Sequence, residues 1–246
     1  MNSPTLSTQP IAGYYGKIPS LGDFITRRVA QNTISVWDNW LRHSLYEAKS
    51  ALPPNSWNDQ YYTSAVWNFI MPPSICGERM IGLIAASVDR VGRQFPFTLF
   101  QPLNLPNGTV LRLEQIMAFY LRHGPVMRAL QQRRLNLEQL EQTLAIFSDW
   151  QATLMWLPQP ATASGGGDIL SVLNGSPKEE EPDDETTVTA GIAITPWPDL
   201  RLAEVMLDNT SYWWTNQAAG CPLRAFTHYG GLNDTLFKTL FSSLTG

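Results

Sequence analysis

A nearly unbroken apolar run, Met80–Val88, constrains the fold of this chain more than any other segment. Strands that are buried on both faces have such continuous runs, whereas strands with one wet face alternate apolar and polar residues. A tight charged turn, Asp89–Arg93, follows the run, and apolar residues then alternate over Phe95–Phe100. We therefore expect a β-hairpin. Because proline has no N–H to donate, Pro96 must lie at a sheet edge or in the first residues of the second strand.

Apolar residues that recur every three or four positions predict four helices. We expect the second helix to end at Gly124-Pro125, because proline interrupts a helix. The third should begin at Asn136, a good N-cap residue with Gln139 three positions later. The four expected helices contain Trp37–Ala48, Leu113–Leu121, Leu137–Phe147 and Leu236–Leu244.

Short segments rich in β-branched and aromatic residues predict further strands. With the helices, they indicate a mixed α+β fold: a single globular domain with a largely antiparallel sheet flanked by helices. The expected strands are Ile11–Lys17, Val66–Met71, Ala190–Trp197, Ser211–Thr215 and Leu223–Tyr229, with a short helix over Leu200–Leu207.

The negative charge of the chain is concentrated in one segment. Gln159–Thr189 contains seven acidic residues and one lysine, a net charge of −6, whereas the whole chain carries −4 and its remainder therefore +2. The segment is also rich in Ala, Ser, Thr, Gly and Pro, so it has little to bury. We expect a disordered N-terminus over 1–10, the main part of the domain over 11–158, a flexible acidic insertion over 159–189, and the rest of the same domain over 190–246.

Composition excludes several classes of protein. Without the acidic segment the chain is nearly neutral, which argues against a nucleic-acid binder, because such proteins have a clustered basic surface. No apolar run approaches the ~20 residues of a membrane span, and Met1–Pro10 lacks the pattern of a secretory signal. Cys76 and Cys221 are too few for a disulfide framework or a four-cysteine zinc site. We expect a cytoplasmic protein with two reduced cysteines.

The usual catalytic and ligand-binding motifs are missing. Gly13–Lys17 resembles a phosphate-binding loop but has two residues between its glycines instead of four, and no Ser or Thr follows the lysine. His43, His123 and His228 show no spacing typical of metal ligands. There is no Gly-x-Ser-x-Gly nucleophile motif. The sequence therefore predicts neither a cofactor nor a metal.

A first segment of unusual composition is Gly13–Phe24. Gly16 and Gly22 allow a positive φ, Pro19 favours a turn, and Asp23 could accept hydrogen bonds from exposed backbone N–H groups. By itself such a segment is typical of a structured turn between two elements.

A second segment is Val88–Phe97, at the tip of the expected hairpin. Arg90 and Arg93 beside Asp89 leave one guanidinium in excess, a good donor for a carboxylate or phosphate of a partner. Gly92 would shape the turn. Opposite charges at a hairpin tip are also common in turns that only contact solvent.

A third segment is Ser211–Thr215. Alternation directs Trp213 and Trp214 to opposite faces of a strand. A sheet covered on one face would expose one of them as a binding anchor, whereas a sheet covered on both faces would bury both.

Together these segments resemble the TagF family, accessory proteins of bacterial type VI secretion systems. The resemblance rests on Gly13–Phe24, on Asp89–Phe97, and on Ser211–Thr215 followed by Gly230-Gly231-Leu232 before a closing apolar helix. Trp37–Leu41 is similar to the first helix of the family. The acidic segment lies outside these motifs, and Asn233 stands where the family motif has proline.

The resemblance implies a cytoplasmic, non-enzymatic regulator that acts after translation, usually as a repressor of the secretion system. It also implies a functional link to a threonine kinase and phosphatase pathway, and a forkhead-associated scaffold protein as the partner that is bound and sequestered. No cofactor is implied. We expect stoichiometric binding through Lys17, Asp23, Arg90, Arg93, Trp213 and Trp214, with Gly16, Pro19, Gly22 and Gly92 shaping the backbone.

Two other classes fit the sequence. An enzyme, either a hydrolase or a phosphate-handling protein, would bring Asp23, Asp89, Arg90 and Arg93 together in one cleft with perturbed pKa values. A structural subunit of the secretion machine would need no such cleft. Dispersal of the four residues over a shallow surface beside an apolar patch would favour a binding protein.

Overall fold

The computed structural model describes residues 11–103, 113–149, 192–194 and 209–241. The N-terminus 1–10, the acidic segment 159–189 and the helix expected over Leu200–Leu207 lie outside these residues, so what the sequence indicates for them remains a prediction.

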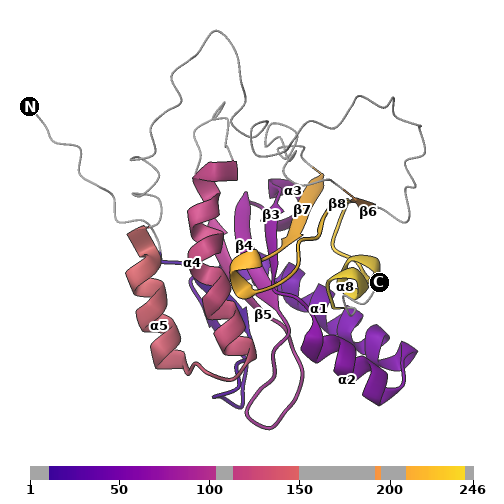
Figure 1. The fold of residues 1–246 in the computed structure, drawn as a ribbon. Coiled ribbons are helices and arrows are strands. Elements are labelled where there is room, and N and C mark those ends of the chain that lie inside the picture. The colour runs from indigo at the N-terminus through magenta and orange to yellow at the C-terminus, as the bar shows by residue number, and fades with distance from the viewer. Residues whose placement is uncertain (1–10, 104–112, 150–191, 195–208, 242–246) are drawn as a thin grey trace, which may run out of the picture.

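The described strands form one eight-stranded sheet in which every neighbouring pair is antiparallel (Figure 1). Their order across the sheet is β2-β1-β5-β4-β3-β7-β8-β6. The expected mixed α+β fold with an antiparallel sheet flanked by helices is confirmed. The strands are β1 (Gly13–Gly16), β2 (Ile25–Arg27), β3 (Trp67–Met71), β4 (Met80–Ala85), β5 (Phe97–Pro102), β6 (Ile192–Ile194), β7 (Thr210–Thr215) and β8 (Ala225–Tyr229).

The apolar run lies in the centre of this sheet. β4 pairs with β3 and β5, and all of its residues are buried, as expected for a strand covered on both faces. An isolated bridge between Val88 and Gln94 closes the hairpin loop. Pro96 directly precedes β5, so it removes no ladder hydrogen bond from this interior strand.

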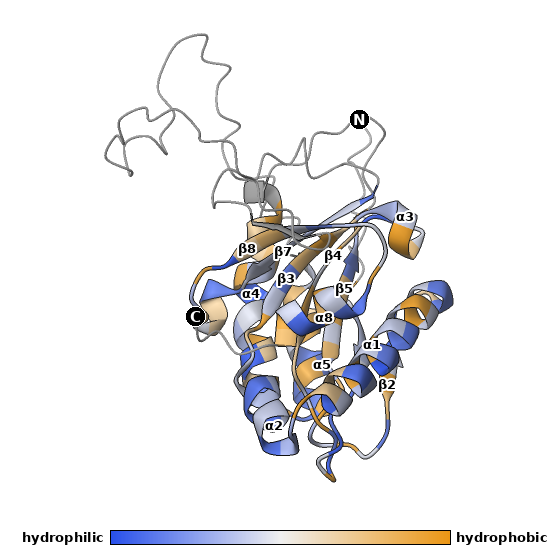
Figure 2. Ribbon diagram, turned by 90° about the vertical axis from the view of Figure 1, so that its right-hand side faces the viewer, coloured by the Kyte–Doolittle hydropathy of each residue, from blue (hydrophilic) through white to orange (hydrophobic). Residues whose placement is uncertain are grey.

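Helices cover both faces of the sheet. α1 and α8 pack over one face and α4 lies over the other (Figures 1 and 2). α5 begins with the predicted Asn136–Gln139 capping box. The helices are α1 (Gln31–Ala51), α2 (Pro54–Thr63), α3 (Pro73–Cys76), α4 (Leu113–Gln131), α5 (Leu137–Ile146) and α8 (Asp234–Phe241).

Aromatic side chains fill the layer between the sheet and the α1–α8 face. The ring centroid of Trp37 lies 5.2 Å from that of Phe69 and 5.1 Å from that of Phe100. Buried indoles need an acceptor for their N–H. Trp37 Nε1 donates to Thr98 Oγ1 (3.0 Å), and Trp67 Nε1 donates to the carbonyl of Leu240 (2.8 Å). These two hydrogen bonds tie α1 and α8 to the sheet.

A polar network fastens α4 to the opposite face. The Tyr120 ring packs against Trp214 at 4.7 Å, and its hydroxyl donates to the carbonyl of Phe69 (2.7 Å). Asn216 Nδ2 donates to Asn68 Oδ1 (2.8 Å) and to the carbonyl of Tyr120 (2.9 Å). Because these groups are buried, each hydrogen bond avoids the cost of an unsatisfied polar atom.

The predicted break at Gly124-Pro125 is wrong, because α4 continues through it to Gln131. A proline leaves the carbonyl four residues earlier without its helical donor. Here that residue is Leu121, whose side chain is exposed, as is Pro125, so water can reach this side of the helix. Gly124 on the buried side packs tightly against Asn216.

Pro53-Pro54 also differs from expectation. It was expected to close the first helical region, but Pro54 begins α2. Proline is favoured at the first helical position, where its missing N–H would have no partner. The sequence thus allowed either a stop or a start at this dipeptide. Neither α3 nor the three-residue strand β2 was predicted.

We expect Gly124→Ala to lower the free energy of unfolding by about 1–3 kcal/mol. A Cβ at this position would lie 2.1 Å from Asn216 Oδ1, inside the buried network. Alanine is intrinsically the better helix former by about 1 kcal/mol, so the steric clash must exceed that gain. Urea unfolding followed by circular dichroism measures the difference.

Gly231→Ala is the matched control. A Cβ there meets nothing within 4 Å and the backbone φ is not positive, so its unfolding midpoint should equal that of the wild type. An equally stable Gly124→Ala protein would contradict the proposed close packing of α4.

Candidate functional site

Two of the segments singled out in the sequence meet in the folded protein. Gly13–Phe24 forms β1 and the turn after it, and Val88–Phe97 forms the loop between β4 and β5. A buried ion pair joins them: Lys17 Nζ lies 2.8 Å from Asp89 Oδ2, with side chains 8% and 0% exposed. The two residues are 72 positions apart in the chain.

Asp89 organises the hairpin loop around its carboxylate. Oδ1 accepts the backbone N–H groups of Val91 (3.1 Å) and Arg93 (2.8 Å), and Oδ2 accepts Lys17 and Arg93 Nε (2.6 Å). Burial alone would raise the pKa of Asp89, but the hydrogen bonds from Lys17 and Arg93 outweigh it and hold the pKa well below its usual range. The carboxylate is therefore ionised and fully engaged.

Backbone hydrogen bonds complete the junction. Arg93 Nη2 donates to the carbonyl of Gly22 (2.5 Å), and the N–H of Arg90 donates to the carbonyl of Leu21 (2.8 Å). The N–H of Leu21 in turn bonds to the carbonyl of Ile18 (3.2 Å), which closes a turn over Pro19-Ser20.

Two of the three glycines expected to shape the backbone have a positive φ. Gly16 has a φ of +136° and Gly92 a φ of +90°, whereas Gly22 has no positive φ. A Cβ on Gly16 would lie 2.2 Å from the carbonyl oxygen of Pro96, so glycine is also required there by the close approach of the two segments.

Phe24 is held at the surface of this junction. Its ring packs edge-on against Phe95 at 4.7 Å, while Lys17 Nζ and the Arg42 guanidinium each lie 4.9 Å from its centroid. Arg42 pairs with Asp38 at 2.7 Å, four residues earlier on α1. The side chain of Phe24 nevertheless remains 38% exposed. Sequence reasoning did not select Phe24 or Arg42, although the Asp38–Arg42 spacing marks an ion pair on a helix.

The predicted contact residues have different positions in the structure. Asp23 and Arg90 are exposed near the junction, and no described carboxylate pairs with Arg90. The Arg93 side chain is 61% exposed but bound to Asp89. Lys17 is buried. Among the six predicted contact residues, Asp23 and Arg90 therefore have the side chains that are most available to a partner.

Of the two alternatives for Trp213 and Trp214, the structure shows the one in which a sheet covered on both faces buries both. Their exposed fractions are 0% and 2%. Trp213 packs beneath α1 and Trp214 beneath α4, because this sheet is covered on both faces. Neither indole is accessible to a partner in this structure.

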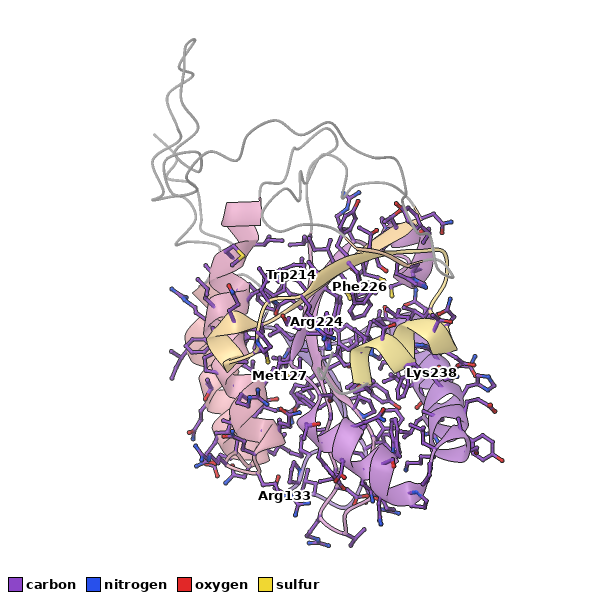
Figure 3. The ribbon with its side chains drawn as sticks, turned by 45° about the vertical axis from the view of Figure 1, so that its right-hand side comes forward. Met127, Arg133, Trp214, Arg224, Phe226 and Lys238 are labelled. Carbon is purple, nitrogen blue, oxygen red and sulfur yellow. The ribbon has the colours of Figure 1, made fainter. Side chains whose placement is uncertain are left out.

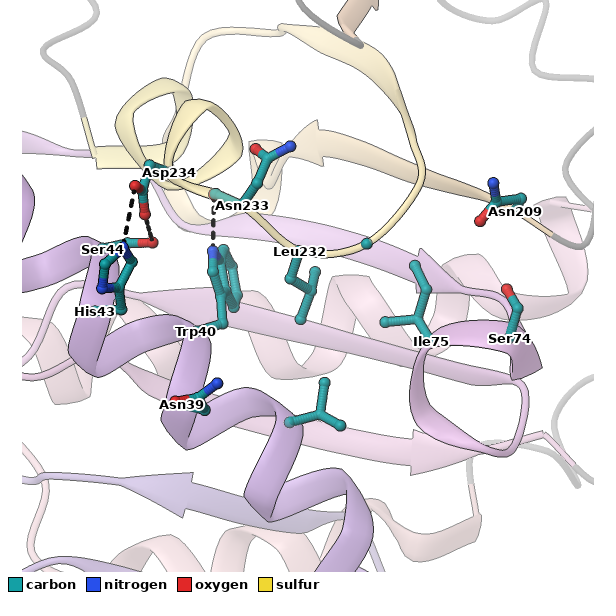
Figure 4. A pocket seen from close by; sticks show the side chains of 12 residues that line it. Asn39, Trp40, His43, Ser44, Ser74, Ile75, Asn209, Leu232, Asn233 and Asp234 are labelled. Carbon is teal, nitrogen blue, oxygen red and sulfur yellow. Dashed lines mark hydrogen bonds and ion pairs between the residues drawn. The ribbon is translucent and has the colours of Figure 1, made fainter.

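A groove of about 690 Å³ forms where α1, α3 and the loop before α8 meet (Figure 4). The loop contains Gly230-Gly231-Leu232, so the closing motif and the first helix line the groove together. Trp40 Nε1 donates to the carbonyl of Asn233 (2.8 Å), and Ser44 Oγ donates to Asp234 Oδ1 (2.5 Å). These bonds fix the loop to α1.

Ser44, His43 and Asp234 have the composition of a hydrolytic triad but not its geometry. In a triad the imidazole lies between the hydroxyl and the carboxylate. Here Asp234 accepts the Ser44 hydroxyl directly, and His43 Nε2 lies 3.5 Å from the other oxygen of the same carboxylate. The arrangement cannot activate Ser44 as a nucleophile.

The described residues offer neither a metal site nor a membrane-spanning helix. They contain no group of three or more His, Cys, Asp or Glu side chains placed to hold a metal ion. None of their helices combines the length and hydropathy needed to cross a bilayer.

Comparison with known proteins identifies relatives of this chain. A family model described as "TagF N-terminal domain, Type VI secretion system-associated" matches residues 13–146. The crystal structure of PA0076 from Pseudomonas aeruginosa PAO1 matches with a TM-score of 0.56 and 22% identity over 94% of each chain. At this identity the similarity concerns the fold. No curated protein matches the sequence.

We expect Asp89→Asn to lower the free energy of unfolding by about 3 kcal/mol, because it leaves Lys17 buried without a counterion. The folded-state pKa of Asp89 lies below its unfolded value of about 3.9. Its contribution is therefore complete above that pH and is lost as the pH falls through the folded-state pKa. Denaturant unfolding from pH 5 to 8 should show a constant difference from the wild type.

Asp23→Asn removes the same charge nearby and should change stability by less than about 0.5 kcal/mol. Equal stabilities of the two variants would show that the ion pair does not hold the junction.

Proposed function

Since this chain belongs to the TagF family, which is associated with the type VI secretion system, we propose that it is a cytoplasmic, non-enzymatic regulator of that system. It acts after translation and represses the assembly or firing of the machine. The match of the family model to residues 13–146 carries this proposal, because that range includes both segments of the Lys17–Asp89 junction.

The proposed mechanism is stoichiometric binding of a forkhead-associated scaffold protein of the secretion system. A repressor of this kind holds the scaffold away from its assembly partners in proportion to its own concentration, by mass action. The amount of free scaffold then links this protein to the threonine kinase and phosphatase pathway. No catalytic turnover is required.

We place the contact with the scaffold on the junction surface, which we define as Asp23, Phe24, Arg42, Arg90 and Arg93. An exposed aromatic side chain fixed between cations loses little conformational freedom on binding, and aromatic and arginine side chains dominate binding energy at interfaces. Phe24 is held in this way by Lys17 and Arg42. Arg90 adds a guanidinium without a described ion-pair partner.

The geometry argues against the enzymatic alternative. Asp89 is fully engaged by donors and cannot act as a base, while Asp23 and Arg90 lie in the open. A general base must reach a substrate proton, and a nucleophile needs an adjacent base. Asp89 and Arg93 form a structural ion pair, and Asp23 and Arg90 are exposed around it. This arrangement is typical of a shallow binding surface.

We expect Arg90→Glu and Phe24→Ser each to weaken capture of the purified scaffold about tenfold, a loss of ~1.4 kcal/mol. The first reverses a charge on the surface, and the second removes its aromatic anchor. Binding is measured by surface plasmon resonance with the full chain immobilised, and thermal unfolding verifies that each variant is folded.

Lys238→Glu and Tyr46→Ser are the matched controls, since they change an exposed lysine on α8 and an exposed tyrosine on α1. Both should bind like the wild type. Folded surface variants with unchanged affinity would contradict the assignment of the surface. A wild-type chain that does not bind the scaffold would contradict the choice of partner.

A further inference from the structure

A small pocket opens beside the junction surface, where the Pro19-Ser20 turn faces the connection between α4 and α5. It has a volume of about 290 Å³, at the lower end for a ligand site. The same turn leads into Leu21 and Gly22, whose carbonyls bond to Arg90 and Arg93. The residues that line the pocket are Pro19, Ser20, Arg133, Arg134, Leu135, Asn136 and Gln139.

Two arginines, Arg133 and Arg134, line this pocket. No described carboxylate forms an ion pair with Arg133 or Arg134, and no acidic residue lines the pocket. Figure 3 shows Arg133 at the end of the molecule opposite Trp214 and Phe226. Two arginines that line one concavity favour a ligand with two negative charges.

The other polar groups of the pocket are also donors. In the capping box of α5, Asn136 Oδ1 accepts the N–H of Gln139 (2.9 Å) and Gln139 Oε1 accepts the N–H of Asn136 (3.0 Å). Both amide oxygens are thus occupied, which leaves both NH₂ groups as donors. Ser20 Oγ is buried and has no hydrogen-bond partner among the described residues. These groups favour a ligand that accepts hydrogen bonds.

Arg133 also occupies an unusual backbone position. Its φ is +61°, and the bonds Arg133 N–H to Leu130 O (2.9 Å) and Arg134 N–H to Ala129 O (2.8 Å) end α4 in a Schellman motif. Glycine is the usual residue at this left-handed position. Arginine here adds strain to the turn while it supplies a side chain to the pocket, as residues at functional sites often do.

We propose that this pocket binds a phosphate monoester. At pH 7 such a group carries a charge of about −1.5 to −2 and offers three acceptor oxygens, whereas a carboxylate carries −1. Arg133 and Arg134 match the charge, and Ser20, Asn136 and Gln139 supply donors for the oxygens. The site goes beyond the proposed function, because it does not depend on which protein the junction surface binds.

Isothermal titration calorimetry on the full chain tests the site with three probes: inorganic phosphate, a peptide with one phosphoserine, and the same peptide without phosphate. The wild type should bind both phosphorylated probes and not the third. Tighter binding of the phosphopeptide identifies a phosphoryl group presented by a protein, and equal binding shows that the phosphate group alone is recognised, as in a small free ligand.

The double variant Arg133→Gly, Arg134→Gln should bind the phosphorylated probes at least tenfold more weakly. Its unfolding temperature should be no lower than that of the wild type, because glycine relaxes the left-handed turn. Ser20→Ala should weaken binding about threefold.

Lys49→Gln, Lys238→Gln is the charge-matched control. It removes two positive charges on α1 and α8 and should leave the affinity unchanged. Equal losses in both double variants, or a wild type that binds neither phosphorylated probe, would overturn the proposal.

Discussion

The buried ion pair between Lys17 and Asp89 is the interaction on which the rest of this structure depends. A carboxylate withdrawn from water is tolerated only when donors surround it, and Asp89 has four. Because three of these come from the hairpin loop and one from the segment after β1, the carboxylate fixes both backbones at once. The exposed ring of Phe24 owes its position to the same lysine, so the surface proposed to meet a partner rests on a buried charge.

Local patterns in the sequence predicted the elements whose signals are local. The apolar run of β4 and the capping box of α5 are clear examples, since each depends on a few neighbouring residues. The predictions at Pro125 and Pro54 were wrong for different reasons. A helix tolerates a proline where its unpaired carbonyl faces water, as at Pro125, and a proline can begin a helix as well as follow one, as at Pro54. Lys17 and Asp89 were both named as candidate functional residues, but nothing in the sequence around either of them indicates that they form an ion pair. The exposure of Trp213 and Trp214 likewise depends on what covers the sheet.

The groove beside α1 and the pocket between α4 and α5 differ in chemical character. In the groove beside α1, hydrogen bonds from Trp40 and Ser44 fix the loop before α8, so these polar groups are satisfied within the protein. The pocket between α4 and α5 instead presents donors that the protein leaves unmatched. The groove is therefore a structural contact between elements, whereas the pocket is complete only with a ligand. The pocket also lies next to the junction surface.

The position of β3 has a consequence for biosynthesis. β3 pairs with β7, where Trp67 lies opposite Thr215, and the Trp67 indole bonds to the carbonyl of Leu240. The pairing of this central strand with β7 and the burial of its aromatic side chains therefore require residues about 150 positions later in the chain. Contacts of such long sequence separation form slowly. During translation Trp40, Trp67 and Phe69 lack these late partners until β7 and α8 have left the ribosome, and apolar surface exposed in this way favours aggregation.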